Sequence, residues 1–417
     1  MYRVIYSLFC LCVLLLFAAN ASLLDWVGWG YYAGGGSAFT KNHPATYLLA
    51  VTALLTLATQ PVWGYVKRPT FLLLAAATLI LLLRALAILS SGAIGGELTA
   101  VLVTFVTPLF LLITIHGIRT EDLRRLAIPL RAFVVVNSLM ALTERMMNQR
   151  LIPSWMDSTH DYRATALMAH PLNGSLLTGL MITYLVTARR GSAPVWQRLP
   201  ELALHAIAMF AFGGRSALVF TSTVLILSAI LGRQERGQAR LSVMQRVLPL
   251  AIVALGILLI FLPIPFVDAT LDRFTNDINS SQTRNSAAYM LSMLSPNELL
   301  AGVEASRRVI LQDFLNTPFG IELAWVALAI SYGMVATLPM LVALPLNLFS
   351  EARSLDRSAF YMALLFLVVT AGSLSIGSKS ILVSEVLLMM HCLAQPRRAA
   401  LFSRRDGTER PGVRTLA

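Results

Sequence analysis

The chain has 417 residues, of which 57% are hydrophobic and only 13% are charged, and its mean hydropathy is +0.70. Soluble globular chains contain about 45–50% apolar and about 25% charged residues, so this composition excludes an ordinary soluble domain. The formal net charge of +12 would suit a nucleic-acid partner, but the placement of the basic residues described below indicates membrane topology instead. We therefore expect no nucleic-acid binding.

Apolar runs long enough to cross a bilayer recur along the whole chain. About 17–25 apolar residues in a helix span a hydrocarbon core of roughly 30 Å. Only helices and closed barrels satisfy backbone polar groups in lipid, and the strict alternation of a barrel strand is absent, so the runs predict helices. We predict an all-α, polytopic membrane protein, one transmembrane domain over 1–417, with about twelve spans at 3–22, 46–64, 70–91, 98–117, 126–143, 171–188, 199–213, 216–232, 246–264, 321–347, 358–373 and 380–393.

Basic residues are divided unequally between the two sides that these spans define. One side receives 22 of the 33 Lys and Arg residues, the other receives ten, and Arg84 lies within a span. The positive-inside rule places the richer side in the cytoplasm. We predict that both termini are cytoplasmic, with a basic tail at 394–417, and that 144–170 and 265–320 face outward. The N-terminus also resembles a signal peptide with a cleavage site at 19–21; we favour an uncleaved span, and the remaining topology is the same in either case.

The outward segments carry most of the polar residues that are not topology anchors. The longest, 265–320, lies between spans nine and ten and contains "SAAYMLSML" and "ASRRVILQDFL", which predict short amphipathic helices at the membrane interface. The cytoplasmic loops are short and Arg-rich. The working face of the protein is therefore expected outside the cytoplasm.

One outward segment leads into the sixth span through "RATALMAHPLNGSLLTG", which contains Arg163, His170 and Asn173. Pro171 suits the first turn of a helix, where its missing N–H is not needed. The start of a helix offers free N–H groups and a positive dipole end, which favour an anion. The alternative is an interfacial anchor, in which the Arg side chain extends to water and the His caps the helix.

A second outward cluster is "FGGRSALVF" (212–220), where two glycines separate two apolar helices and Arg215 follows. An Arg at such a turn is costly unless it meets an anion or water. Arg guanidinium groups bind phosphate oxygens through two parallel hydrogen bonds. We predict an outward basic pocket formed by Arg163, Arg215, Arg284, Arg307 and Arg308.

Two ionisable residues lie deeper in the predicted spans. Arg84 is near the outward end of span three, and Glu385 is near the outward end of span twelve, at a similar depth. One interpretation is a structural salt bridge between them. The other is that Arg84 faces the anion pocket and binds substrate.

These motifs, in this order and on one side, resemble the O-antigen ligase and polymerase superfamily (Wzy-type), and especially the VpsF-type exopolysaccharide polymerases. "RATALMAHPLNGSLL" is similar to the family's Arg and "hPN" segment, and "GGRSALV" is similar to its "SRGAL" turn. After the long outward loop, "FGIELAWVALAISYGMVAT" is similar to its late segment. "FTKNHPATYLL" and "SLSIGSKSILV" are similar to the VpsF-type subgroup.

The resemblance implies a metal-independent, inverting glycosyl transfer at the periplasmic face of the bacterial inner membrane, without a cofactor. The donor is an undecaprenyl-diphosphate-linked glycan, the diphosphate leaves, arginines hold it, and a carboxylate or imidazole activates the acceptor hydroxyl. The implied partners are this lipid-linked glycan, membrane lipid and other polysaccharide export proteins.

The late outward segment provides the candidate catalytic base. Ligases of the family carry His where this chain has Glu322, and the usual following Asn is Leu323 here, which favours a polymerase. A carboxylate at this position is suited to take a proton from a sugar hydroxyl. Trp325 offers an aromatic surface for a sugar ring. The alternative for Glu322 is an ordinary N-terminal helix cap.

Three other functions compete with the polymerase. A ligase would transfer the glycan to another acceptor. A transporter or flippase usually has inverted repeats and broken helices with charges near the bilayer midplane, and the sequence indicates neither. A non-catalytic subunit of an export complex is the third.

Overall fold

The computed structural model describes residues 1–31, 37, 39–90, 96–152, 163–188, 195–231, 278–315, 321, 323–373 and 376–396. Within these ranges the chain is helical and contains no β-strand, in agreement with the predicted fold class. The helices are α1 (Tyr2–Ala18), α2 (Ala21–Trp26), α3 (Pro44–Thr59), α4 (Trp63–Val66), α5 (Pro69–Ser90), α6 (Gly96–Val101), α7 (Thr107–Gly117), α8 (Thr120–Arg125), α9 (Ala127–Met147), α10 (Pro171–Thr187), α11 (Val195–Phe212), α12 (Arg215–Leu231), α15 (Ile278–Ser292), α16 (Pro296–Ala301), α17 (Ala305–Phe314), α18 (Ala324–Tyr332), α19 (Met334–Ser354), α20 (Arg357–Ala371) and α21 (Leu382–Leu393).

Four helical stretches of the described chain are long and apolar enough to cross a membrane: Pro69–Ser90, Gly96–Gly117, Thr120–Met147 and Met334–Ser354. Shorter apolar helices accompany them, including α1, α3, α12, α20 and α21. On α5, large apolar side chains such as Leu72, Leu79 and Leu83 are at least half exposed. Such a continuous exposed apolar surface suits lipid and not water, so the chain is a helical, membrane-embedded protein.

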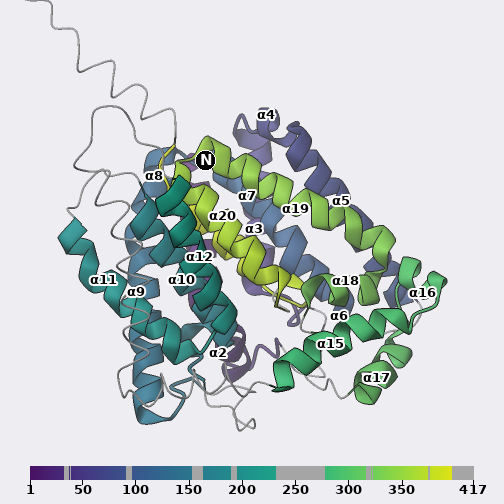
Figure 1. The fold of residues 1–417 in the computed structure, drawn as a ribbon. Coiled ribbons are helices and arrows are strands. Elements are labelled where there is room, and N and C mark those ends of the chain that lie inside the picture. Colours follow the sequence, from purple (N-terminus) through teal and green to yellow (C-terminus); the bar gives the residue numbers. More distant parts are fainter. Residues whose placement is uncertain are drawn as a thin grey trace, which may run out of the picture.

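The helices run between two ends of one bundle (Figure 1). The end that carries the N-terminus and α8 is called the terminal end; there the Tyr2 hydroxyl donates to Asp122 at 2.6 Å. The other end carries the segment 163–170, the turn between α11 and α12, and α15, α16 and α17, and is called the loop-rich end (Figure 1). The described part of the predicted long loop, 278–315, therefore lies at the same end of the bundle as the segment before α10 (Figure 1).

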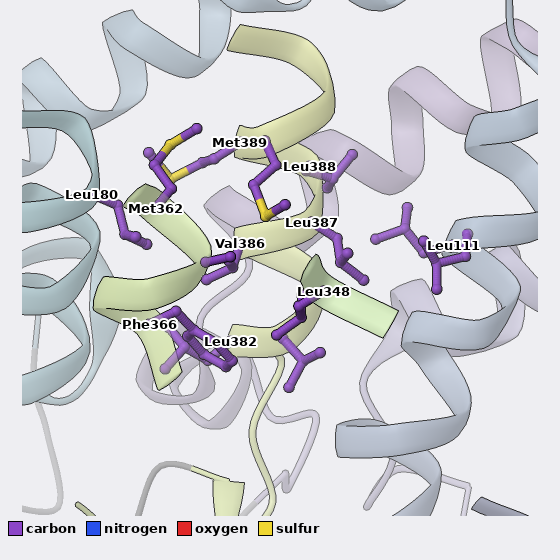
Figure 2. Packing of buried hydrophobic residues seen from close by; sticks show 14 of the residues in the cluster. Leu111, Leu180, Leu348, Met362, Phe366, Leu382, Val386, Leu387, Leu388 and Met389 are labelled. Atoms are coloured by element: carbon purple, nitrogen blue, oxygen red, sulfur yellow. The ribbon is translucent and has the colours of Figure 1, made fainter. Parts of the chain in front are cut away.

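The helix α21 lies at the centre of the bundle, and all of its residues are buried. Figure 2 shows its side chains between Leu180 of α10, Phe366 of α20, Leu111 of α7 and Leu348 of α19. A mostly apolar helix of this kind is stable because other helices surround it on every side.

Most predicted spans correspond to a helix within a few residues. The predicted span 246–264 lies outside the described residues. The two amphipathic stretches of the long loop are confirmed as helical, since "SAAYMLSML" begins within α15 and "ASRRVILQDF" forms α17.

The predicted continuous span 321–347 is wrong, because the chain breaks at Gly333 into α18 and α19. Gly333 has φ +80° and lies against the backbone of Gly302, which has φ +88°. A Cβ at Gly333 would lie 2.2 Å from the carbonyl oxygen of Leu300. The Val303 N–H donates to the Ile330 carbonyl at 2.7 Å. The backbone after α16 thus fills the break. The sequence analysis found no sign of a broken helix, and the structure corrects this for α18 and α19.

Candidate functional site

The segment that precedes α10 is fixed by one buried carboxylate. Glu144, in the last turn of α9, has no exposed surface. Its two oxygens accept the backbone N–H groups of Leu151, Thr165 and Ala166 at 3.0, 2.8 and 2.9 Å. Charge-assisted hydrogen bonds of this kind are about twice as strong as neutral ones. Glu144 therefore determines the path of the backbone that follows Arg163.

Two asparagines complete this support. Asn137 of α9 accepts the N–H of Leu167 at 3.0 Å, and the Asn20 side chain donates to the Leu167 carbonyl at 2.5 Å. Ala166 and Ala169 have φ +46° and +56°, which is unfavourable for a residue with a Cβ. The hydrogen bonds on either side offset that strain and hold the segment between α9 and α2.

His170 caps α10. Its Nδ1 accepts the N–H of Leu172 at 3.2 Å, and Pro171 occupies the first helical position, as predicted. Loss of solvation, followed by the charge of Arg163, lowers the pKa of His170 to about 4. The ring is therefore neutral at physiological pH, with its hydrogen on Nε2. The capping role matches the alternative interpretation of the sequence, and it leaves one N–H donor on the ring.

A second His-Pro pair is used in the same way. His43 caps α3 by accepting the Ala45 N–H at 3.2 Å, and its Nε2 donates to the Ala19 carbonyl at 2.8 Å. Burial lowers the pKa of His43 to about 4. Each His-Pro pair thus begins a helix at the loop-rich end, and His43 also ties α3 to the end of α1.

The turn between α11 and α12 packs directly on the start of α10. A Cβ at Gly174 would lie 2.4 Å from the Phe212 ring, and a Cβ at Gly214 would lie 2.4 Å from the Ser175 hydroxyl. Ser175 also donates to the Gly214 carbonyl at 3.4 Å. Close approach requires both glycines. The structure therefore brings together the two sequence motifs that contain His170 and Arg215.

Four of the predicted substrate-binding residues lie near the start of α10, and the others lie elsewhere or outside the described residues. Arg163, His170, Asn173 and Arg215 all belong to the start of α10, the segment before it, or the α11–α12 turn. Arg163 acts on the charge state of His170 and accepts a hydrogen bond from Arg150 through its carbonyl at 3.4 Å. These four residues form the candidate site.

Two arginines of the predicted pocket have other partners. Arg308 forms an ion pair with Glu97 and donates to the Ser331 hydroxyl at 3.0 Å. Arg307 pairs with Glu298 at 2.5 Å. Arg307 and Arg308, which the sequence analysis places in the outward basic pocket, thus fasten α17 to α16 and α6.

Arg84 lies in α5, which packs against α19 and α6 on the other side of the bundle from α10 and α12 (Figure 1). Its Nε is buried and has no hydrogen-bond partner. Glu385 is buried in α21, and the ion pairs of the described chain do not include one between it and Arg84. The salt-bridge interpretation of this pair is thus not supported.

Three predicted residues are placed only in part. Glu322 and the side chain of Arg284 lie outside the described residues. Trp325 is the second residue of α18 and is 37% exposed, so its ring is open to a ligand.

Lys379 is a residue of the loop-rich end whose role the sequence did not reveal. Its ammonium donates to the carbonyls of Tyr31 and Lys41, the latter at 3.1 Å, and lies 3.7 Å from the centre of the Tyr31 ring. Burial lowers its pKa to about 8. Lys379 thus joins the segments "FTKNHPATYLL" and "SLSIGSKSILV".

A π-helical turn at Leu102–Val106 supports the same segment. Within it, the Thr104 hydroxyl donates to the Ser378 carbonyl at 2.9 Å and accepts the Ser380 N–H at 3.0 Å. Such turns occur often at functional sites. The segments before α3, α10 and α21 are therefore all held by specific polar contacts at the loop-rich end. No protein-family model matches this chain, and no curated protein sequence is similar to it.

Proposed function

We propose that the protein is a polysaccharide polymerase that joins undecaprenyl-diphosphate-linked repeat units at the periplasmic face of the bacterial inner membrane. The observation that carries this proposal is the packing of the start of α10 on the α11–α12 turn, which places His170, Asn173 and Arg215 at one end of a membrane-embedded bundle beside Arg163. In the proposal, about twelve spans cross the membrane, both termini are cytoplasmic, and the loop-rich end is periplasmic.

The proposed transfer is inverting and uses no metal. The acceptor hydroxyl oxygen attacks the anomeric carbon of the donor, and the bond from that carbon to the diphosphate oxygen breaks. Glu322 takes the hydroxyl proton, and Arg163, Arg215 and Arg284 neutralise the departing diphosphate. Arg suits this task because its planar fork matches two phosphate oxygens and keeps its charge at any physiological pH.

The neutral state of His170 supports a role for this residue at a sugar or phosphate group. Its Nδ1 is used by the cap, so its Nε2–H is available as a donor. The rigid backbone from Arg163 to His170, held by Glu144, would present that donor in a fixed position. Preorganised donors of this kind stabilise developing negative charge without reorganisation during the reaction.

A transporter or flippase is the second candidate, because the break at Gly333 is a feature of transporter helices. Here the break is filled by the backbone of Gly302. A ligase that uses another acceptor has the same donor chemistry as the polymerase.

Deletion of the gene, followed by analysis of lipid-linked glycans, separates these functions. Accumulation of single lipid-linked repeats is the result expected for the polymerase. Accumulation of full-length lipid-linked chains would indicate a ligase, and repeats trapped in the inner leaflet would indicate a flippase.

A further inference from the structure

A group of polar side chains lies at the terminal end, opposite the candidate site. It consists of four buried residues, Tyr65 from α4, Asn347 and Glu351 from α19 and His391 from α21, and of His116 from α7, whose side chain is 19% exposed, and is called the buried polar cluster. Glu351 has no exposed surface; its Oε2 lies 3.2 Å from Nε2 of His391 and 3.4 Å from Nε2 of His116. Four helices that are distant in sequence meet at this carboxylate.

The tautomer of His116 is fixed by its own helix. Its Nδ1 lies 2.9 Å from the Leu112 carbonyl oxygen, which accepts but cannot donate, so Nδ1 carries a hydrogen. In the neutral ring, Nε2 then presents a lone pair, and the atom facing it is a carboxylate oxygen. Two lone pairs facing each other repel. A proton bound to either partner converts this contact into an attraction.

The charge of the cluster leads to the same conclusion. With both imidazoles neutral and Glu351 ionised, a net negative charge is buried inside a membrane-embedded bundle, which is expensive. Arg68 is the basic residue beside the cluster; its exposed guanidinium lies 5.1 Å from the centre of the Tyr65 ring and forms no ion pair with Glu351 in the described chain. One bound proton would make the cluster neutral.

The polar atoms of the cluster also have unused hydrogen-bonding capacity. The Tyr65 hydroxyl interacts with Glu351 and Asn347, and both oxygens of Glu351, both amide atoms of Asn347 and that hydroxyl are buried without a well-aligned hydrogen bond in the described protein. Buried polar atoms of this kind are costly unless they gain a partner, and a proton held at the carboxylate would supply one.

We propose that the buried polar cluster is a proton-binding site, in which Glu351 and the imidazoles of His116 and His391 share one exchangeable proton. The bound proton links α19 to α7 and α21 at the terminal end. Its release leaves a buried negative charge and weakens the contact between these helices. Imidazole is the side chain that ordinarily exchanges protons between pH 5 and 8, so the proposal is tested across and above that range. This inference does not depend on the proposed polymerase function.

The test is the thermal unfolding midpoint of the purified full-length protein in detergent, measured from pH 5.5 to 9. The protonated cluster is neutral and the deprotonated cluster is negative, so the site stabilises the wild type at low pH and loses that effect as the pH rises. Glu351→Gln is neutral at every pH. We expect the midpoint of the wild type to fall relative to Glu351→Gln by about 2–4 °C across the range. A difference between the two that is the same at every pH would overturn the proposal.

Glu201→Gln is the matched control. Glu201 also neighbours a histidine, His205, at 3.7 Å, but Arg131 pairs with it at 2.5 Å and supplies a permanent positive charge. This variant should lose stability without altering the pH profile. If Glu351→Gln does not fold, His116→Gln replaces it and is expected to remove the same pH dependence. If neither variant folds, the wild-type protein alone tests the proposal. A thermal unfolding midpoint that does not fall between pH 6 and 9 then contradicts it.

Discussion

Single polar side chains in apolar helices determine the geometry of the candidate site. Glu144 and Asn137 lie on the same helix and bind backbone N–H groups of one short segment, 165–167. Neither residue is placed to touch a substrate in the proposed reaction. Their effect is to hold the backbone between Arg163 and His170 in a conformation that includes two strained alanines. Buried side chains inside the bundle thus fix the position of the residues of the candidate site.

The arginines of the candidate site are expected to be sensitive to a change of shape at constant charge. Arg163→Lys and Arg215→Lys should each reduce polymer formation, because a point charge does not replace the two-pronged contact with phosphate. Arg284→Lys should do the same. Polymer formation in isolated membranes, normalised to the amount of protein, is the measurement.

Arg307→Lys is the matched control, since Arg307 is engaged with Glu298 and should keep near-normal activity. If the three other Lys variants polymerise as well as this control, those arginines are topology anchors.

His170 is expected to have a function beyond its cap. His170→Asn retains a side-chain oxygen that caps a helix well, whereas His170→Ala removes the cap, at a cost of about 0.5–2 kcal/mol. Both variants should lose product, and only His170→Ala should also lose thermal stability. Normal product from His170→Asn would show that the residue is only a cap. Asn173→Ala, in the same turn, should reduce product without loss of membrane insertion.

Glu322→Gln tests the proposed base. Glutamine keeps the shape of the side chain but cannot accept the proton, and loss of a general base typically lowers the rate by about 10²–10⁴. Polymer formation should fall by that order while donor binding and protein amount remain unchanged. Glu304→Gln, in the same outward region, is the control. Near-normal polymer from Glu322→Gln would exclude this assignment, and Asp313 would be the next acid to test.

At the scale of elements, the loop-rich end is held together by backbone contacts between segments. The break between α18 and α19 exists because the chain after α16 occupies the space that a continuous helix would need. Arg308 and Glu97 fasten the neighbouring α17 and α6. Where α16 and α17 meet the bundle, therefore, the contacts are polar and close, in contrast to the apolar packing around α21.

Gly333→Ala is expected to destabilise the protein. The new Cβ would meet backbone at 2.2 Å, and the φ of +80° is unfavourable for any residue with a side chain. Overpacking alone costs about 1–3 kcal/mol, and the backbone conformation adds about 1–2 kcal/mol. Gly372→Ala is the control, because its nearest neighbour lies at 3.9 Å. A thermal midpoint of Gly333→Ala equal to that of the control would contradict the described break.

At the scale of the whole molecule, the helices were predictable because long apolar runs have few alternatives in lipid. Pro171 likewise marks a helix start from its own chemistry. The break at Gly333 was not predictable, since a glycine within "ISYGMVA" suits either a continuous or a broken helix, and the backbone of Gly302 decides between them.

The candidate site was likewise predictable only in part from the sequence. The meeting of His170 with the turn before Arg215 follows from motifs on one side of the membrane. The roles of Glu144 and Lys379 do not, because their partners are backbone N–H and carbonyl groups that leave no pattern in the sequence. The buried polar cluster was missed for another reason: Tyr65, Glu351 and His391 are far apart in the chain and only the folded bundle joins them.

The orientation of the bundle is the last prediction. The structure places the segment before α10 and α15–α17 at one end, and α8 with its connection to α7, which carry Arg119, Arg124 and Arg125 of the 22 basic residues of the richer side, at the other. By the positive-inside rule the terminal end is cytoplasmic, because translocating clustered Arg residues is unfavourable. Fusions of a reporter enzyme that is active only in the periplasm should be active after Gln149 and Ser295 and inactive after Gly191, Arg236 and Ala417. The fusions after Gln149 and Gly191 form the critical pair, since the predicted span at α10 lies between them. Activity after Gly191 or Arg236 would invert the topology and place the candidate site in the cytoplasm, where the proposed lipid-linked donor is not polymerised.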